Sequence, residues 1–282
     1  MSGAMIDLQN LHPVDWSIVG PALLAGLLVL ATHVPLGLQV LRKGIVFIDL
    51  AIAQIAGLGV MLADTLGLEP QGWAVQVSAV SAALLGAALL TWTERRWPDI
   101  QEALIGALFV VASCVGILML SGNPHGGEHL KDLLVGQILW VSPGQLQAMA
   151  ALTAVVLGLW WVLPQRLART GFYVLFALAV TASVQLVGVY LVFSSLIMPA
   201  LAVRHLQDSA GDKPRLRLVG MAYGLGALAY GLGLGLSAML DWPSGAVVVV
   251  LMALVCMVGS AAIARPWAQV QGERLKPPAH RA

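Results

Sequence analysis

Four polar side chains interrupt long apolar stretches of the chain: His33, Asp49, Gln54 and Gln185. Asp49 is the one formal charge among them, and carboxylate and imidazole groups are common ligands of divalent metal ions. If the apolar stretches cross a membrane, burying this carboxylate costs at least ~2.5 kcal/mol unless it faces a cavity, a partner or an ion. We interpret Asp49 either as a ligand or gate in a permeation path, or as a carboxylate near the interface that pairs with Arg42 or Lys43.

His33 is the second candidate ligand in this set. Pro35 follows it closely, and a proline inside a helix frees a backbone carbonyl and can kink the helix. A buried histidine is also commonly hydrogen-bonded in packing, so both interpretations stay open. Gln54 lies five residues after Asp49, which places the two side chains on somewhat different faces of a helix.

A further group of candidate ligands lies in the glycine-rich segment 122–129, which reads GNPHGGEH. His125, Glu128 and His129 place two imidazoles and one carboxylate within five residues on a flexible backbone. Such a set can collect a divalent cation such as zinc. The alternative is a solvated turn that holds no ion.

The sequence contains no motif for nucleotide binding or hydrolysis. It has no phosphate-binding loop of the Walker type, no nucleophile elbow and no zinc-protease helix motif. Cys114 and Cys256 each stand alone, so neither a disulfide framework nor a zinc knuckle is indicated. We expect no resident cofactor and no enzymatic activity of the chain itself.

The composition indicates that an integral membrane protein positions these groups. Of the 282 residues 59% are hydrophobic and only 10% charged, whereas a soluble domain carries about 45–50% apolar and about 25% charged residues. The apolar runs are continuous rather than alternating, which favours an all-α bundle in the lipid bilayer over a barrel. The net charge of +1 gives no indication of nucleic-acid binding.

Runs of about 20 apolar residues can cross the hydrocarbon core, and the sequence predicts eight full spans plus one short broken helix. The runs are Ser17–Leu41, Gly44–Ala63, Trp73–Thr93, Ala103–Ser121, Gln145–Leu163, Thr170–Val203, Leu218–Leu240 and Trp242–Ala264. Thr170–Val203 is too long for one crossing, so we expect a break near Ser194-Ser195 and Pro199. Leu133–Val141 is expected at the interface, because the turn signal Ser142-Pro143-Gly144 follows it.

The basic residues determine the predicted topology. With the amino terminus outside, 14 of the 15 lysines and arginines fall on the cytoplasmic side, and Lys131 is the exception. Residues 1–16 form an extracytoplasmic segment, residues 17–265 the transmembrane domain and residues 266–282 a cytoplasmic tail. The first fifteen residues contain no Lys or Arg, so we expect no cleavable signal peptide.

Two pairs of glycines predict close helix packing within the span Leu218–Leu240. Gly220 with Gly224, and Gly231 with Gly235, have the small-xxx-small spacing that lets membrane helices approach one another. The pairs fit either tight packing in the bundle or an interface that moves during transport.

Four segments, in order and covering about residues 17–265, carry a resemblance to a known family. Residues 187–200 read VGVYLVFSSLIMPA and look like the signature VGVLLV-x-x-LLI-x-PA of bacterial ABC permeases for zinc, manganese and iron uptake. Residues 37–44 resemble the end of the first helix of that family, and residues 134–142 resemble its lfG-x-il-x-vs segment. Residues 233–237 with 242–245 resemble its final hairpin.

This resemblance implies a permease of the bacterial inner membrane that imports a divalent metal, zinc or manganese, by alternating access. It also implies a homodimer of permeases, a cytoplasmic ABC ATPase and an extracytoplasmic metal-binding protein as partners. The family usually has Asp-x-x-x-His in its second helix, but here Ala53 and then Gln54 stand after Asp49, so the expected histidine is missing.

The resemblance places the ATPase contact in the turn Pro164–Gly171, which is shorter than the coupling segment of the family. Its matching residues are Arg166, Leu167, Ala168, Arg169 and Gly171. The alternative to an ABC permease is an ion-gradient-driven secondary transporter or channel, but such carriers often have paired broken helices and only one is predicted here. An intramembrane enzyme that uses His33 and Asp49 would lack a nucleophile at matching depth.

Overall fold

The protein is described by a computed structural model that covers residues 15–68, 72–120, 134, 136–162, 168–207 and 216–274. Within this part of the chain the regular structure is helical, which confirms the predicted all-α class. The helices are α1 (Trp16–Lys43), α2 (Ile48–Thr65), α3 (Trp73–Arg96), α4 (Gln101–Leu120), α6 (Pro143–Val162), α7 (Ala168–Val187), α8 (Val189–Ala202), α9 (Arg204–Gln207), α10 (Leu216–Leu240) and α11 (Ser244–Arg274). Short 3-10 turns lie at Pro98–Ile100 and, as η3, at Ile138–Trp140.

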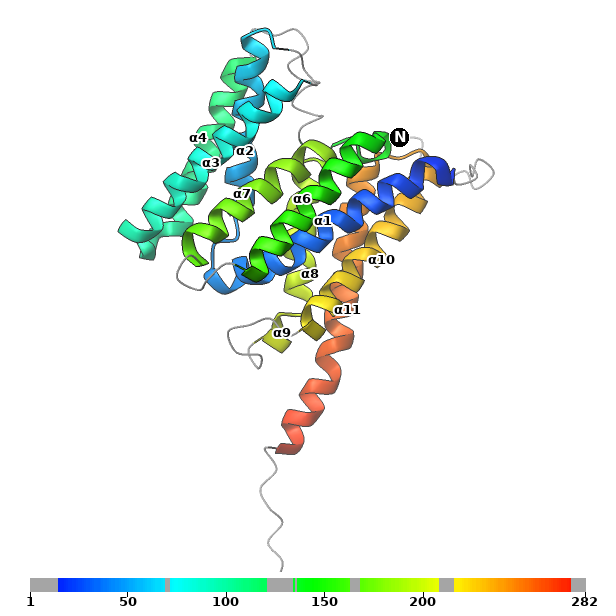
Figure 1. The fold of residues 1–282 in the computed structure, drawn as a ribbon. Coiled ribbons are helices and arrows are strands. Elements are labelled where there is room, and N and C mark those ends of the chain that lie inside the picture. Colours follow the sequence, from blue (N-terminus) through cyan, green and yellow to red (C-terminus); the bar gives the residue numbers. More distant parts are fainter. Residues whose placement is uncertain are drawn as a thin grey trace, which may run out of the picture.

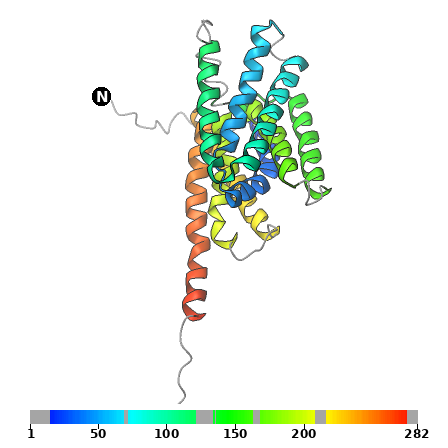
Figure 2. The ribbon, with the colours of Figure 1, turned by 90° about the vertical axis from the view of Figure 1, so that its left-hand side faces the viewer.

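The predicted number of membrane spans is confirmed. In the described part of the chain eight helices are long and apolar enough to cross a membrane, and α8 is a shorter apolar helix. Figure 2 shows α11 as one long helix whose carboxy-terminal part extends beyond the bundle. It runs to Arg274, so no helix end coincides with the predicted domain boundary at residue 265.

Local signals at both ends explain where α1 begins and ends. The Asp15 carboxylate caps the helix by accepting hydrogen bonds from the Ser17 backbone N–H at 2.9 Å and the Ser17 hydroxyl at 2.7 Å. These bonds lower the pKa of Asp15. At the other end Gly44 has φ 68°, a left-handed conformation that glycine adopts without strain, and its N–H caps the helix.

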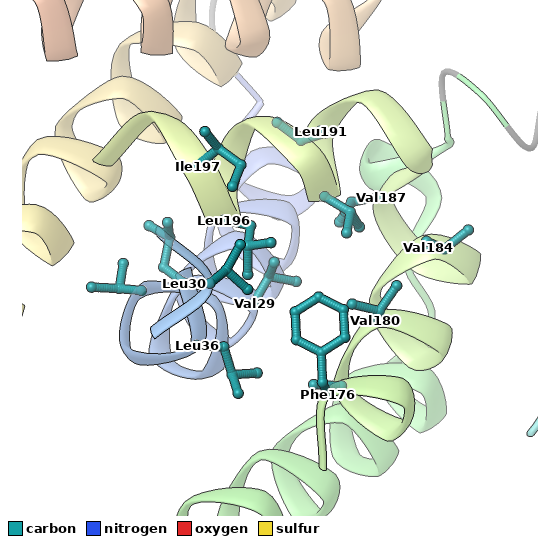
Figure 3. Packing of buried hydrophobic residues seen from close by; sticks show 14 of the residues in the cluster. Val29, Leu30, Leu36, Phe176, Val180, Val184, Val187, Leu191, Leu196 and Ile197 are labelled. Atoms are coloured by element: carbon teal, nitrogen blue, oxygen red, sulfur yellow. The ribbon is translucent and has the colours of Figure 1, made fainter. Parts of the chain in front are cut away.

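The helices α1, α7 and α8 form the centre of the bundle (Figures 1 and 3). Helix α1 contacts α6, α7, α8 and α10. Figure 3 shows Val29 of α1 close to Leu196 of α8. Leu30 lies on another side of α1, against Gly226 of α10. In contrast, α4, α6 and α11 expose most of their apolar side chains, because they lie at the outside of the bundle, where lipid covers them.

The predicted position of the helix break was wrong. Helix α7 ends at Val187 and α8 begins at Val189, so the break lies at Gly188, whereas Ser194, Ser195 and Pro199 lie inside α8. Gly188 has φ 81° and ψ 162°, a combination that is essentially restricted to glycine. Pro199 is tolerated because it stands near the end of a short helix.

The prediction that the glycine pairs of α10 pack tightly within the bundle of one chain was also wrong. A side-chain atom added at Gly220, Gly224, Gly231 or Gly235 would meet nothing within 4 Å. The close approaches of α10 are made instead at Gly226, against Leu30 of α1, and at Gly233, against Val248 of α11. The small-xxx-small pairs therefore lie on the outward face of the helix, since each pair shares one side of the helical wheel.

Candidate functional site

Asp49 lies in the first turn of α2 with only 1% of its surface exposed. Neither carboxyl oxygen has a hydrogen-bond partner, which is rare for a buried charged group. The nearby Lys43 ammonium pairs with Glu94 instead, at 3.0 Å, so the interpretation of a Lys43–Asp49 pair is wrong.

His33 lies in the middle of α1 and is completely buried. Its Nδ1 lies 2.9 Å from the Val29 carbonyl oxygen and 3.1 Å from the Thr32 hydroxyl, and because the carbonyl can only accept, we assign the proton to Nδ1. The lone pair of a neutral imidazole is then on Nε2, and Nε2 has no hydrogen-bond partner. Metal-binding histidines commonly hold the same tautomer through a backbone carbonyl. Nε2 of His33 can therefore accept a hydrogen bond or bind a cation.

Further buried polar atoms on α1 and α7 have no hydrogen-bond partner among the described residues: Gln39 Oε1, Thr181 Oγ1, Ser183 Oγ and Gln185 Nε2. Of these residues only Gln185 stood out in the sequence. Serine and threonine in membrane helices usually bond a carbonyl of the preceding turn, as Ser195 does with Leu191 at 2.6 Å, so they give little sequence signal. Thr181 and Ser183 depart from this pattern.

The structure does not assemble a complete metal cage in the residues that it describes. Nowhere in these ranges do three or more His, Cys, Asp or Glu side chains converge in a way that could hold an ion. The predicted loop ligands His125, Glu128 and His129 lie outside the described residues. His33 and Asp49 therefore provide two separate donors on the helices α1 and α2.

The predicted ATPase contact is described only in part. Arg166 and Leu167 lie outside the described residues, whereas Ala168 and Arg169 begin α7 and Gly171 is buried in its first turn. Thr170 accepts a hydrogen bond from Arg95 of α3 at 2.9 Å. This bond ties the start of α7 to the end of α3.

A group of polar contacts surrounds the start of α7. Lys43 lies over the rings of Phe172 and Tyr173, and the Gln101 side-chain amide lies 3.4 Å from the Tyr173 hydroxyl. The same amide donates to the Leu90 carbonyl at 3.0 Å. The ends of α1, α3, α4 and α7 that are predicted to face the cytoplasm are thus connected. Sequence reasoning missed this group, because a lysine at the end of a span is already explained by the positive-inside rule.

The opposite end of the bundle carries a shallow cleft of about 390 Å³. Its lining comes from the segment around η3 and from the turn between α10 and α11: Gly136, Gln137, Leu139, Trp140, Asp241, Trp242, Pro243 and Ser244. Trp140 and Trp242 are exposed, and Asp241 has φ 52°, which is uncommon for a residue other than glycine. Along the sequence, the first residue that lines the cleft, Gly136, follows shortly after the predicted outer loop 122–129.

The comparison with protein families decides the class of the chain. The model of the ABC 3 transport family matches residues 15–172 and 161–263. The chain belongs to the ABC 3 transport family. It is a multi-pass membrane protein of the bacterial inner membrane and a permease component, and this family membership confirms the resemblance found in its sequence.

Similarity to known proteins extends over most of the chain. YfeC, a chelated iron transport system membrane protein of Yersinia pestis, is 26% identical over 209 residues, which cover 67% of this chain and 69% of YfeC. An uncharacterized membrane protein of Synechocystis is 25% identical over 280 residues, which cover 92% of this chain and 95% of that protein. PsaBC from Streptococcus pneumoniae, solved with a Fab, is similar in fold: the TM-score is 0.67 at 21% identity, covering 89% of this chain and 92% of the solved one.

Proposed function

We propose that the chain is the permease subunit of an ABC importer for a divalent metal ion, zinc or manganese, and that it works by alternating access. The observation that carries this proposal is the pair of buried, unpartnered donors in a member of the ABC 3 transport family: the Asp49 carboxylate and Nε2 of His33. Carboxylate and imidazole suit both metals. The name of the relative YfeC makes iron the third metal to test.

The incomplete ligand set fits a permeation path better than a storage site. A transported ion must bind well enough to enter and weakly enough to leave, and two single donors on the separate helices α1 and α2 would hold it only weakly and in turn. Oε1 of Gln39, together with the hydroxyls of Thr181 and Ser183, can supply weaker oxygen contacts on α1 and α7. A metal that has lost part of its water shell gains these contacts in passing.

The chain has no nucleotide site of its own by sequence, so the energy comes from a cytoplasmic ABC ATPase. We place its contact at Pro164–Gly171, where α7 begins beside the ends of α1 and α3. On the outer side an extracytoplasmic metal-binding protein would dock over the cleft around Trp140 and Trp242 and deliver the ion near His125, Glu128 and His129.

A second copy of the chain completes the proposed importer. The outward face of α10 carries Gly220, Gly224, Gly231 and Gly235, where an added side-chain atom would meet no other described part of the chain within 4 Å, and Leu228 and Leu232 between them are exposed. Small residues of this spacing let two membrane helices approach closely. In a background without Cys114, the variant Gly224→Cys is expected to form an intermolecular disulfide, whereas Leu254→Cys on the exposed face of α11 is not.

Reconstitution tests the proposal directly. The chain is co-expressed with its partner ATPase and metal-binding protein and placed in proteoliposomes. Uptake of Zn²⁺, Mn²⁺ and Fe²⁺ is then measured with and without ATP. We expect ATP-dependent uptake of zinc or manganese. Uptake that follows an ion gradient and ignores ATP would instead identify a secondary transporter, and a preference for iron would overturn the assignment of the metal.

A further inference from the structure

Lys43 makes three contacts at the cytoplasmic end of the bundle. Its Nζ lies 3.0 Å from Oε1 of Glu94 on α3, 5.3 Å from the centroid of the Phe172 ring and 5.8 Å from that of Tyr173. Both rings belong to the first turns of α7. A cation within about 6 Å of a ring centroid is attracted by the negative face of the ring. One ammonium group therefore joins the end of α1 to both α3 and α7.

The burial of this contact gives it more weight than an ordinary surface ion pair. The side chains of Lys43 and Glu94 are only 24% and 16% exposed. Exposed ion pairs contribute little because water and salt screen them, whereas partly buried pairs are screened less. A shift of the Phe172 and Tyr173 rings must therefore move the ammonium group or lose the contact.

The rings stand next to the predicted ATPase contact. Phe172 directly follows Gly171, the last residue of the turn Pro164–Gly171. Thr170, in the first turn of α7, is held by Arg95 of α3, one residue after Glu94. A force applied to the turn by a moving ATPase thus reaches Lys43 and Glu94 over less than one turn of α7.

A short connection joins Lys43, at the end of α1, to Asp49 in the first turn of α2. Gly44 ends α1 in its left-handed conformation, and α2 begins at Ile48, so four residues separate the two helices. Phe47, just before α2, donates its N–H to Oε1 of Glu102 at 3.3 Å. Ile45, in the same connection, is buried. Because the connection is short and held at both sides, motion of Lys43 is transmitted to the first turn of α2.

We propose that Lys43 is a positioning residue that couples movement of the ATPase-contacting turn to the Asp49 carboxylate, through its contacts with Phe172, Tyr173 and Glu94. This inference rests on the proposed function, since it assigns Lys43 a part in ATP-driven transport. The alternative is a contact that only stabilises the folded bundle. The two differ in one measurable quantity, the amount of metal transported for each ATP hydrolysed.

The experiment uses the full chain with its ATPase and metal-binding protein in proteoliposomes, with Mn²⁺ and Zn²⁺ as probes. In the variant Lys43→Met we expect ATP hydrolysis to continue while metal transported per ATP falls by about tenfold, the change that loss of a partly buried cation–π contact can produce. Lys43→Arg is expected to keep the coupling ratio, because a guanidinium both pairs with a carboxylate and stacks on a ring. Arg96→Met removes a charge from the exposed end of α3 and is the matched control.

A charge reversal separates the ring contact from the ion pair. The double variant Lys43→Glu with Glu94→Lys restores the pair but places a carboxylate over the negative faces of the two rings, so coupling is expected to stay low. Full recovery in this double variant would show that the ion pair alone matters and would overturn the role of the rings. If Lys43→Met fails to assemble, Phe172→Leu serves in its place, because it keeps the ion pair and loses a ring.

Two outcomes would overturn the inference as a whole. One is a wild-type coupling ratio in Lys43→Met or, if that variant does not assemble, in Phe172→Leu. The other is an equal loss in Arg96→Met, which would reflect net charge at the membrane surface. Failure of the proposed function has a different signature, since the wild-type complex would then show no ATP-dependent uptake of either probe.

Discussion

Gly136 packs directly against the peptide that joins Val187 to Gly188, at the break between α7 and α8. A Cβ at position 136 would overlap the Val187 carbonyl group and the Gly188 nitrogen, and Gly136 has φ 70°. The segment before η3 and the α7–α8 break therefore fit together only because both positions are glycine. This contact anchors the amino-terminal end of α8.

The first prediction concerns this glycine contact. Gly136→Ala and Gly188→Ala are each expected to destabilise the protein by ~1–3 kcal/mol, because both positions have positive φ and the first also lacks space. The measurement is thermal unfolding of the purified chain in detergent. Gly144→Ala, in the first turn of α6 with nothing within 4 Å, is the control and should not lower the melting temperature. An unchanged melting temperature in Gly136→Ala would contradict the packing described above.

The second prediction concerns Asp49. Asp49→Asn is expected to reduce ATP-dependent metal uptake by at least about tenfold, because the neutral amide is a far poorer ligand for a divalent cation. The amount of assembled complex should stay the same or rise, since the substitution removes an unpaired buried charge. Uptake at limiting Mn²⁺ and Zn²⁺ is measured beside the yield of complex.

Asp64→Asn is the matched control for Asp49→Asn, because Asp64 lies in the last turn of the same helix and is exposed. It should leave uptake unchanged. Normal uptake in Asp49→Asn would show that this carboxylate does not contribute to the permeation path. His33 would then be the main buried candidate for a metal ligand.

The third prediction concerns the turn Pro164–Gly171. Leu167→Asp together with Ala168→Asp is expected to uncouple ATP hydrolysis from transport without unfolding the bundle, because both positions lie between the spans Gln145–Leu163 and Thr170–Val203 that the sequence predicts. Coupling is measured as metal transported per ATP in proteoliposomes, and folding as retention of the complex on gel filtration. Wild-type coupling in this double variant would point to another ATPase contact, and the stretch Arg204–Arg217 is the next candidate on the cytoplasmic side.

The sequence predicted the spans well because their signal is local. Each helix needs about 20 apolar residues, and eight such runs could be counted directly. The sequence predicted that Thr170–Val203 is broken, but it did not locate the break. Pro199 is the stronger sequence signal, whereas the break lies at Gly188, whose backbone angles require glycine. Which of the α10 glycines pack depends on the rotation of the helix, and that is fixed by contacts with α1 and α11.

The candidate site was predictable only where a residue is unusual for a membrane helix. His33 and Asp49 stand out because imidazole and carboxylate are rare at that depth. Lys43 did not, because its role depends on Phe172 and Tyr173, more than 120 positions away in the sequence, and on Glu94 of a third helix. Contacts of this kind arise from the fold and leave no spacing pattern.

The last prediction concerns the outer loop, where His125, Glu128 and His129 are proposed to receive the metal from the binding protein. Only a neutral imidazole can bind a metal, so uptake should weaken as the pH falls through the ordinary histidine pKa of about 6.5. His125→Ala together with His129→Ala should slow uptake at limiting metal, flatten this pH dependence and spare assembly with the ATPase. Asn123→Ala, in the same loop, is the control and should do neither. If the double variant transports zinc and manganese at wild-type rates at low metal concentration, the loop is an ordinary solvated turn, and the ion must reach Asp49 and His33 directly from the docked protein.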